Sequence, residues 1–153
     1  MAFDVDNLFM RLAIEQARIG LHAGNAPIGC VIVGDGKLVA AGHNRVASDR
    51  DPTAHAEIVT IRAASRIASQ SDLGGMTLYT TLQPCGMCTM ASLWAKIARI
   101  VYGASRANVH PMYFEERHLN TADYIRDAYR DNIALTGAIL INECAALYDQ
   151  PPD

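Results

Sequence analysis

Cysteine is scarce in this sequence, with four residues in 153. Four cysteines are too few for a disulfide-dense scaffold, and the close pair Cys85 and Cys88 favours metal or redox chemistry in a reducing compartment. No stretch approaches the roughly 18 to 20 apolar residues of a transmembrane helix. The first seven residues carry two aspartates where a secretory signal carries lysine or arginine. We therefore expect a cytoplasmic protein without a membrane partner.

Positive charge is also limited. The 13 Lys and Arg residues are outnumbered by 16 Asp and Glu, and residues 105–153 hold four arginines against eight carboxylates. Proteins that bind nucleic acids present Lys and Arg to the phosphates, so this balance argues against a nucleic-acid partner. Half of the residues are apolar and 19% are charged, which is typical of a globular protein. The length is that of one ordinary domain, and we expect a single domain over residues 1–153.

The hydrophobic pattern predicts a mixed α/β protein. A helix is expected over 5–23, followed by strands over 28–33 and 38–41 that form a hairpin, because Gly34-Asp35-Gly36 tolerates the positive φ angles of a tight turn. A helix that starts at Asp51-Pro52-Thr53 is expected to run to about Ser69. The remaining expected elements are a strand at 76–80, a helix at 84–94, a strand at 100–102, an irregular stretch at 104–120, a helix at 121–130, a strand at 133–141 and a helix at 142–148. The order strand, helix, strand in the middle predicts parallel neighbours, and the whole predicts a three-layer α/β/α sandwich with a mixed five-stranded sheet.

Two short motifs contain residues that bind metals. Pro84-Cys85-Gly86-Met87-Cys88 begins one predicted helix, and His55-Ala56-Glu57 begins another. Residues three apart on a helix share a face, so Cys85 and Cys88 can bind one ion, and His55 would supply a third ligand. Both thiols fall in a first helical turn, where the helix dipole favours the thiolate form. Two thiolates and one imidazole suit Zn²⁺.

Glu57 is informative through its angle to His55. Side chains two residues apart on a helix point about 200° away from each other, so the two can meet only beyond the helix end. With three ligands found, the fourth position of the metal is open to water, which is typical of catalytic zinc. Glu57 could then take a proton from that water and deliver it to a leaving amine, and the backbone N–H groups of Ala56 and Cys85 could stabilise the intermediate. A structural zinc site or a redox dithiol is the alternative interpretation.

In this order the motifs match the zinc deaminase signature His-x-Glu followed by Pro-Cys-x-x-Cys. The sequence resembles the cytidine deaminase-like superfamily, in particular the branch that holds tRNA adenosine deaminases, fungal-type cytosine deaminases and bacterial guanine deaminases. The similarity runs over about residues 13–104. The resemblance implies zinc as cofactor, a homodimer and the following roles: His55, Cys85 and Cys88 as zinc ligands, Glu57 as the proton shuttle and Asn44 as a hydrogen-bond partner of the substrate base.

Three functions are compatible with these motifs. The charge balance favours a hydrolytic deaminase of a small free base or related amino-heterocycle. A tRNA-specific adenosine deaminase is the first alternative, since residues 51–58 and 143–147 resemble those enzymes. The second is a catalytically silent, zinc-stabilised interaction domain, although such a domain needs no acid beside an open zinc site.

Residues 102–116 bear on the choice of base. Their length and the ending Phe114-Glu115-Glu116 resemble bacterial guanine deaminases, which carry an acid at the position of Asn108. Asparagine both donates and accepts hydrogen bonds, so Asn108 could admit a different ring, and cytosine competes with guanine as the substrate. The apolar group 112–114 lies in an irregular stretch, and we expect it to form a lid in which Phe114 packs over a flat heterocycle.

Other apolar and sulfur-containing residues have simpler interpretations. Cys30 and Cys144 are expected to be small buried hydrophobes, not ligands. Met90 and Trp94 on the predicted metal-binding helix are expected to pack in the core. Ala91, Leu93 and Trp94 on the same helix could also form a patch that pairs two subunits.

Overall fold

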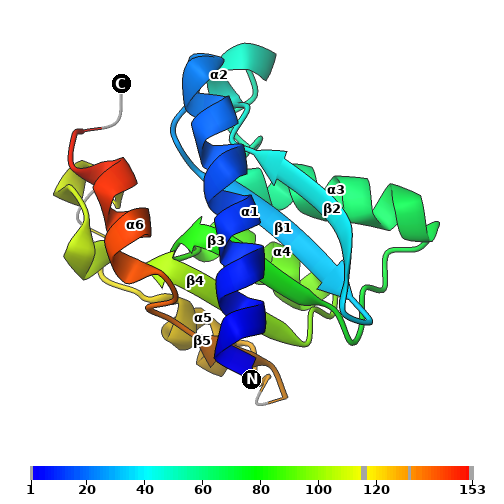
Figure 1. Cartoon of the computed structure of the whole chain (residues 1–153). Helices are drawn as coiled ribbons and strands as arrows, with labels where there is room; N and C mark the ends of the chain where they lie inside the picture. The colour runs from blue at the N-terminus through cyan, green and yellow to red at the C-terminus, as the bar shows by residue number, and fades with distance from the viewer. Residues whose placement is uncertain (1, 115–116, 131, 152–153) are drawn as a thin grey trace.

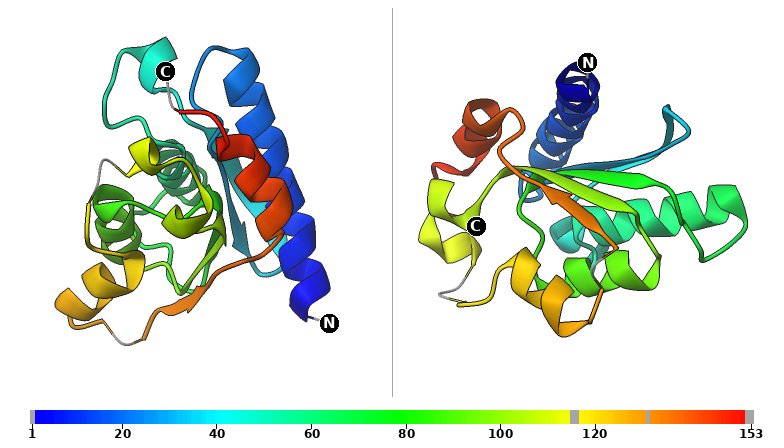
Figure 2. Two further views of the ribbon diagram at one scale, coloured as in Figure 1. Left: turned by 90° about the vertical axis from the view of Figure 1, so that its left-hand side faces the viewer. Right: turned by 90° about the horizontal axis from the view of Figure 1, so that it is seen from below.

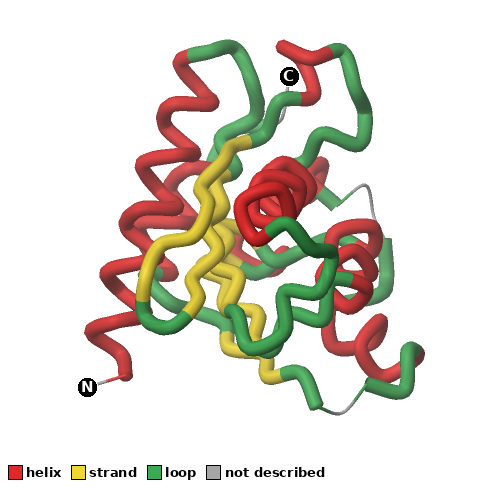
Figure 3. Tube along the Cα trace, turned by 90° about the vertical axis from the view of Figure 1, so that its right-hand side faces the viewer, coloured by secondary structure: helices red, strands yellow, loops and turns green. Residues whose placement is uncertain are grey.

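The computed structural model describes residues 2–114, 117–130 and 132–151. The pair Glu115-Glu116, which contributes to the guanine deaminase resemblance, lies outside these residues. A mixed five-stranded sheet lies between two layers of helices, as predicted (Figures 1 and 3). Helices α1 (Ala2–His22) and α6 (Ile141–Ala145) cover one face of the sheet, and α3 (Ala56–Ala68) and α4 (Gly86–Trp94) cover the other (Figure 2). Among the described helices, none combines the length and the apolar character needed to cross a bilayer.

The strand order of the sheet is β2-β1-β3-β4-β5. The strands are β1 (Gly29–Gly34), β2 (Lys37–His43), β3 (Thr77–Leu82), β4 (Arg99–Ala104) and β5 (Ala134–Thr136). The neighbours of β1 are antiparallel to it, whereas β3, β4 and β5 are parallel to one another. The predicted parallel pair around α4 is therefore confirmed, because a helix that links two neighbouring strands returns the chain to the edge where the first strand started.

The predicted hairpin between β1 and β2 is present. Gly34 pairs with Lys37, so the turn contains only Asp35 and Gly36, with φ angles of 52° and 74°. Positive φ at both central positions is the type I′ geometry that matches the twist of the two strands. Gly29 at the other end of β1 has a second constraint, since a Cβ there would lie 1.9 Å from the carbonyl oxygen of Ala13. The close packing of α1 on the sheet therefore requires glycine at this position.

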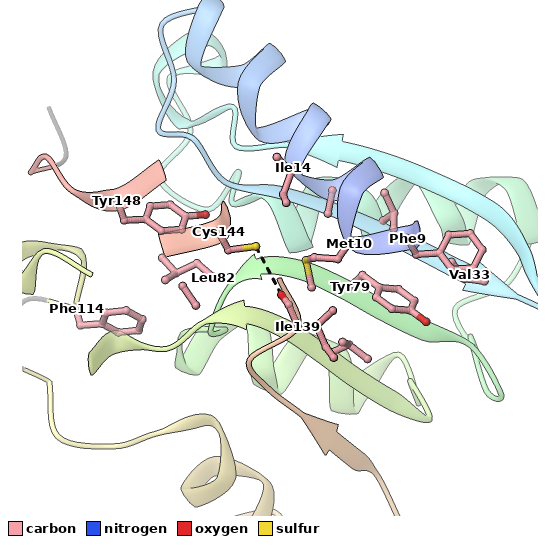
Figure 4. Packing of buried hydrophobic residues seen from close by; sticks show 14 residues of the cluster. Phe9, Met10, Ile14, Val33, Tyr79, Leu82, Phe114, Ile139, Cys144 and Tyr148 are labelled. Atoms are coloured by element: carbon pink, nitrogen blue, oxygen red, sulfur yellow. Dashed lines mark hydrogen bonds between the residues drawn. The ribbon is translucent and has the colours of Figure 1, made fainter. Parts of the chain in front are cut away.

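The first core cluster lies between the sheet and the α1 and α6 layer. Its side chains come from both helices and from the sheet face that they cover (Figure 4). Cys144 and Tyr148 of the C-terminal segment are fully buried in it, and the ring of Tyr148 packs edge-on against Tyr113. The segment after β5 is thus part of the core. The second cluster, which includes Ile32, Leu78 and Ile100, lies on the opposite face of the sheet under α3.

A buried ion pair joins α1 to the sheet. The guanidinium of Arg99 on β4 donates hydrogen bonds of 2.8 and 2.7 Å to the two carboxylate oxygens of Asp6, and the Tyr79 hydroxyl donates a third of 2.8 Å. Burial raises the pKa of Asp6, but the hydrogen bonds from Arg99 and Tyr79 outweigh it, and the pKa lies below its ordinary value. The charged form of Asp6 therefore contributes to stability.

The structure corrects two expected boundaries. The helix expected from Pro52 begins at Ala56, because the Asp51 carboxylate instead accepts hydrogen bonds from the N–H and hydroxyl of Thr53 and closes a turn. The strand expected over 133–141 is confined to Ala134–Thr136. Ala138 and Leu140 have φ angles of 64° and 51°, which are incompatible with an extended strand.

The irregular stretch and the last helices follow the prediction more closely. Two 3₁₀ turns, η1 (Arg106–Asn108) and η2 (Pro111–Tyr113), lie in the stretch expected to be irregular. Helix α5 (Thr121–Asp127) follows, and α6 continues into the turn η3 (Ala146–Tyr148). The short helix α2 (Val46–Asp49) was not expected from the sequence.

The prediction that Trp94 packs in the core is wrong. Its side chain is 77% exposed, whereas its neighbour Leu93 is 3% exposed. Trp94 is the last residue of α4, and adjacent residues at a helix end point in different directions, so only one of the two can face the sheet. Cys30 and Cys144 are both fully buried, as expected of small hydrophobes.

Candidate metal centre and active site

The two motif-bearing helices begin at the same place. His55 is the N-cap residue of α3, Cys85 is the N-cap residue of α4, and Cys88 lies in the first turn of α4. Neither His55 nor Cys85 caps its helix through its side chain, so both side chains are free to bind another group. Cap residues have extended backbone, which directs their side chains past the helix end. The first turns of α3 and α4 thereby bring two sulfurs and one imidazole together.

The distances between these atoms fit a tetrahedral ion. The sulfurs of Cys85 and Cys88 each lie 3.6 Å from Nδ1 of His55, and the three ligand atoms lie within 4.8 Å of one another. Zinc–sulfur and zinc–nitrogen bonds of about 2.3 and 2.0 Å at a tetrahedral angle would separate sulfur from nitrogen by about 3.5 Å. The donor set and its spacing therefore fit Zn²⁺. These three residues fill three of the four positions of a tetrahedral ion.

The electrostatics of the two thiols differ. A hydrogen bond from Cys88 lowers the pKa of Cys85 to about 4 against the effect of burial, with a further lowering by His55. The same hydrogen bond and burial raise the pKa of Cys88. Cys85 is therefore the more acidic thiol of the pair, and a metal that binds both sulfurs as thiolates would also remove the proton of Cys88. The thiolate of Cys85 also raises the pKa of His55.

Glu57 is a buried carboxyl group beside this cluster. Its side chain is 4% exposed, and the hydroxyl of Thr80 donates a hydrogen bond of 2.7 Å to Oε1. The charge of Glu57 also contributes to the raised pKa of Cys88. Burial and the nearby Cys85 thiolate raise the pKa of Glu57, against the opposing effect of the Thr80 hydrogen bond. A raised pKa brings a carboxyl group closer to the range in which a general acid–base catalyst both takes up and releases a proton.

Two predicted substrate-binding residues, Asn44 and Ala56, lie on either side of the ligand His55 in the sequence. Asn44 is buried where β2 ends, and its Oδ1 accepts a hydrogen bond from the N–H of Val46. Within the described residues its Nδ2 makes no hydrogen bond to protein, which leaves a donor for another partner. Ala56 is the first residue of α3, so its N–H has no partner within the helix.

The other two predicted substrate-binding residues have structural contacts of their own. Asn108 is exposed, and its Oδ1 accepts hydrogen bonds from the N–H and the hydroxyl of Ser105, which closes the turn η1. Phe114 is buried in the first core cluster, and Figure 4 shows its ring next to Leu82. Met112 is the exposed member of the predicted lid group. The contacts of Asn108 and Phe114 with a substrate stay predictions.

Two buried polar residues near the site were not identified from the sequence. Thr80 lies on β3 in a run that resembles an ordinary buried strand. Gln83 comes just before the Pro84-Cys85 motif, and its amide accepts a hydrogen bond from the N–H of Arg106 and donates one to Asn120. The only sequence signal for either residue was a polar side chain in an apolar strand or beside a ligand motif, and that signal does not name a partner.

Comparisons with known proteins agree with this geometry. Residues 4–104 match the cytidine and deoxycytidylate deaminase zinc-binding region. The chain is 34% identical over 142 residues to a tRNA-specific adenosine deaminase from Buchnera aphidicola subsp. Schizaphis graminum, a match that spans 93% of this chain and 90% of the relative. It is 44% identical over 100 residues, 65% of its own length, to a chloroplastic tRNA(adenine(34)) deaminase from Arabidopsis thaliana, and this match spans only 8% of that relative.

The fold comparison points to the same group of proteins. A solved structure of a guanine deaminase from Nitrosomonas europaea superposes with a TM-score of 0.82 at 26% sequence identity, over 92% of this chain and 81% of the other. The predicted sandwich, zinc as the cofactor and the resemblance to nucleobase deaminases are thereby confirmed. The chain belongs to the zinc-dependent cytidine and deoxycytidylate deaminase family.

Proposed function

We propose that this protein is a hydrolytic deaminase in which Glu57 transfers the protons of the reaction. The observation that carries the proposal is the buried Glu57 carboxyl group in the first turn of α3, two residues after His55, which meets Cys85 and Cys88 in one cluster of ligand atoms. When bound by these residues, zinc supplies a Lewis acid that lowers the pKa of a water molecule towards about 7. Glu57 accepts one proton from the attacking water and passes it to the ring nitrogen. It then takes the second proton from the hydroxyl group that has been added to the ring carbon and passes it to the amino group, which leaves as ammonia while the C=O bond forms.

Other residues would orient the base. Asn44 offers its unused Nδ2 donor to the ring, and the N–H of Ala56 stabilises the negative charge that develops on the oxygen added to the ring carbon. We assign Asn108 and Phe114 to the substrate side of the site, where Asn108 retains its amide N–H groups as donors and Phe114 supports the lid segment from within the core. This assignment is tested by the effect of each residue on KM.

Adenosine in a tRNA is the leading substrate candidate. Its support is the identity of 34% over nearly the full length of a relative named as a tRNA-specific adenosine deaminase. An RNA substrate needs positive charge at the site, and Arg50 is an exposed residue in the loop between Asn44 and His55. A tRNA substrate predicts that ammonia release falls steeply as the salt concentration rises.

A free guanine-type or cytosine-type base is the second candidate. Its support is the negative net charge of the chain, together with two arginines whose guanidinium groups already bond to other groups of the protein. Arg45 is paired with Asp49 at 2.9 Å, and the guanidinium of Arg106 donates hydrogen bonds to the carbonyl oxygens of Arg117 and His118. The structural likeness to a guanine deaminase adds to this support.

One assay separates these functions. Ammonia release is measured with guanine, cytosine, adenine, their nucleosides, aminotriazines and an anticodon stem-loop. Turnover of the stem-loop alone supports the tRNA enzyme, and turnover of a free base supports the second candidate. Glu57→Ala should abolish turnover, by about 10²-fold to 10⁴-fold or more, while zinc and fold are retained. Glu15→Gln, at an exposed position of α1, is the matched control. A zinc-loaded protein that releases no ammonia from any compound would instead favour a silent interaction domain.

We further propose a homodimer of one-domain chains that works in the cytoplasm. The exposed side chains of Trp94 and Met87 on α4 would form part of the contact between subunits, whereas Leu93 is buried within the chain. One chain has a mass of 16.6 kDa, and light scattering should give twice that mass. A strict monomer at micromolar concentration would contradict the dimer.

A further inference from the structure

Thr80 is linked to the carboxyl group of Glu57 by a short buried hydrogen bond. The Thr80 hydroxyl donates to Oε1 of Glu57 across 2.7 Å. Thr80 is 0% exposed and Glu57 is 4% exposed, so bulk solvent does not weaken the hydrogen bond between them. A hydrogen bond to a charged acceptor in such surroundings is roughly twice as strong as one between neutral groups, and it fixes the geometry of both partners.

The sheet holds Thr80 far more firmly than α3 alone can hold the Glu57 side chain. Thr80 pairs with Cys30 of β1 on one side and with Tyr102 of β4 on the other, so its backbone lies in the middle of three strands. Its β-branched side chain has restricted rotation about χ1. Glu57 in contrast reaches its carboxylate through three rotatable bonds from the first turn of α3. The hydroxyl is therefore a fixed point and the carboxylate is the movable partner.

The direction of the side chain is set by the strand. Thr80 points towards α3, and the next residue, Thr81, points to the opposite face, where its hydroxyl bonds to Tyr148. The Thr80 hydroxyl also lies 3.3 Å from the carbonyl oxygen of Leu82. A hydroxyl has one proton and two lone pairs, so Thr80 can turn its proton to Leu82 and still accept a hydrogen bond from Glu57. The contact can thus persist whether Glu57 holds a proton or has released it.

We propose that Thr80 is a positioning residue for the reaction: it holds Oε1 of Glu57 so that the carboxyl group stays beside the three ligand atoms in the orientation needed for proton transfer. This inference rests on the proposed role of Glu57 in deamination, and it is independent of which base is the substrate. Glu57 lies in the first turn of α3, two residues after the ligand His55, and the strand that carries Thr80 holds its carboxyl group from the side of the sheet.

The test compares two replacements that separate the hydroxyl from the shape of the side chain. Thr80→Val keeps the shape and removes the donor, whereas Thr80→Ser keeps the donor and removes a methyl group. Thr81→Val is the matched control, since it removes a buried hydroxyl from the next position of the same strand without touching Glu57. For each variant kcat and KM are measured on the compound that the wild type turns over best in the panel above, together with bound zinc and Tm.

We expect Thr80→Val to lower kcat by about 10-fold to 100-fold, the usual effect of removing a hydrogen-bond partner behind a site residue, with KM and zinc within about twofold of the wild type. Thr80→Ser, which keeps the hydroxyl group, should have a kcat within about threefold of the wild type. Thr81→Val should lower Tm and leave kcat within about twofold. A crystal structure of Thr80→Val should show the Glu57 carboxyl group rotated away from its wild-type position.

Two results would overturn the inference. One is a folded, zinc-loaded Thr80→Val protein with the kcat of the wild type. The other is equal loss in Thr80→Ser and Thr80→Val, which would assign the effect to packing. Thr80→Ala provides a second donor-free variant if the valine protein fails to fold. Failure of the proposed function is recognised separately, because then the wild type itself releases no ammonia or Glu57→Ala retains full activity.

Discussion

The metal-binding region and the segments 105–114 and 117–121 meet just before the start of α4, where Arg106 bonds to Gln83 and Thr121 bonds to Pro84, but they are built in different ways. The ligands and Glu57 lie on the first turns of α3 and α4, which pack on a sheet whose central strands are almost wholly buried. Residues 105–114 contain two 3₁₀ turns that are closed by side-chain hydrogen bonds such as those of Asn108 and His110. Apolar burial against a sheet holds many residues in place together, whereas a side-chain hydrogen bond that closes a turn holds only a few neighbouring residues.

This difference indicates how the two regions divide the work. The ligand region has to keep atoms within tenths of an ångström for the chemistry to proceed. The capped segment tolerates local change, which is typical of loops that select a substrate. Changes in the first region should therefore affect zinc and kcat, and changes in the second should affect KM.

The largest effect is expected from removal of a ligand. Cys88→Ser should reduce bound zinc from one per chain to less than about one-tenth and abolish turnover, since the hydroxyl of serine is a poor ligand and metal affinity is linked to folding. Elemental analysis and a thermal melt measure both effects. Cys144→Ala removes another fully buried thiol and should keep its zinc. A Cys88→Ser protein with stoichiometric zinc would contradict the ligand assignment.

The next effect concerns the frame that carries the ligands. Asp6→Asn breaks a largely buried ion pair and should lower the free energy of unfolding by about 2–4 kcal/mol, measured by urea titration, without loss of zinc. Asp4 is exposed and lies two residues before Asp6 in α1, so Asp4→Asn is the control. It should change the free energy of unfolding by less than about 1 kcal/mol.

The same pair predicts a pH dependence. The pKa of Asp6 is lower in the folded protein than its ordinary value of 3.8, so its contribution is complete above that value and is lost as the pH falls through the folded pKa. The stabilities of wild type and Asp6→Asn should therefore converge in acid. A difference that is constant from neutral pH to below the folded pKa would show that the charge of Asp6 is not responsible.

A smaller effect is expected where the two regions join. Gln83→Leu removes the hydrogen bonds to Arg106 and Asn120, each worth about 1 kcal/mol, and should raise KM by about three- to tenfold while zinc and kcat change little. Gln70→Leu, an exposed glutamine in a turn, is the control. If Gln83→Leu instead lowered kcat and left KM alone, the proposed division between the regions would be wrong.

The smallest effect distinguishes two neighbours on α4. Trp94→Ser should change the free energy of unfolding of the monomer by less than about 0.5 kcal/mol, because the side chain is 77% exposed. Leu93→Ala should cost about 2–5 kcal/mol, because that side chain is 3% exposed. Thermal or urea unfolding at low protein concentration measures both. A large loss for Trp94→Ser would mean that the ring stabilises the chain itself.

The sequence predicted those features that depend on a few neighbouring residues. Asp35-Gly36 specified the hairpin turn, and the spacing of Cys85 and Cys88 placed two sulfurs on one helical turn. The start of α3 was misplaced because Asp51 has two competing uses, a helix cap or a local turn, and both have the same sequence pattern. The length of β5 was overestimated because positive φ at Ala138 and Leu140 is imposed by surrounding structure, and neither residue type signals it.

The sequence by itself determined the chemistry of the site: which atoms can bind zinc, which carboxyl group can carry a proton, and that both lie at helix starts. Only the tertiary structure decided which distant residues meet. The hydroxyl of Thr80 reaches Glu57 because the register of β3 against β1 and β4 points it towards α3, and a shift of one residue would present Thr81 instead. Local spacing is written in the chain, but the pairing of strands depends on the packing of the whole sheet.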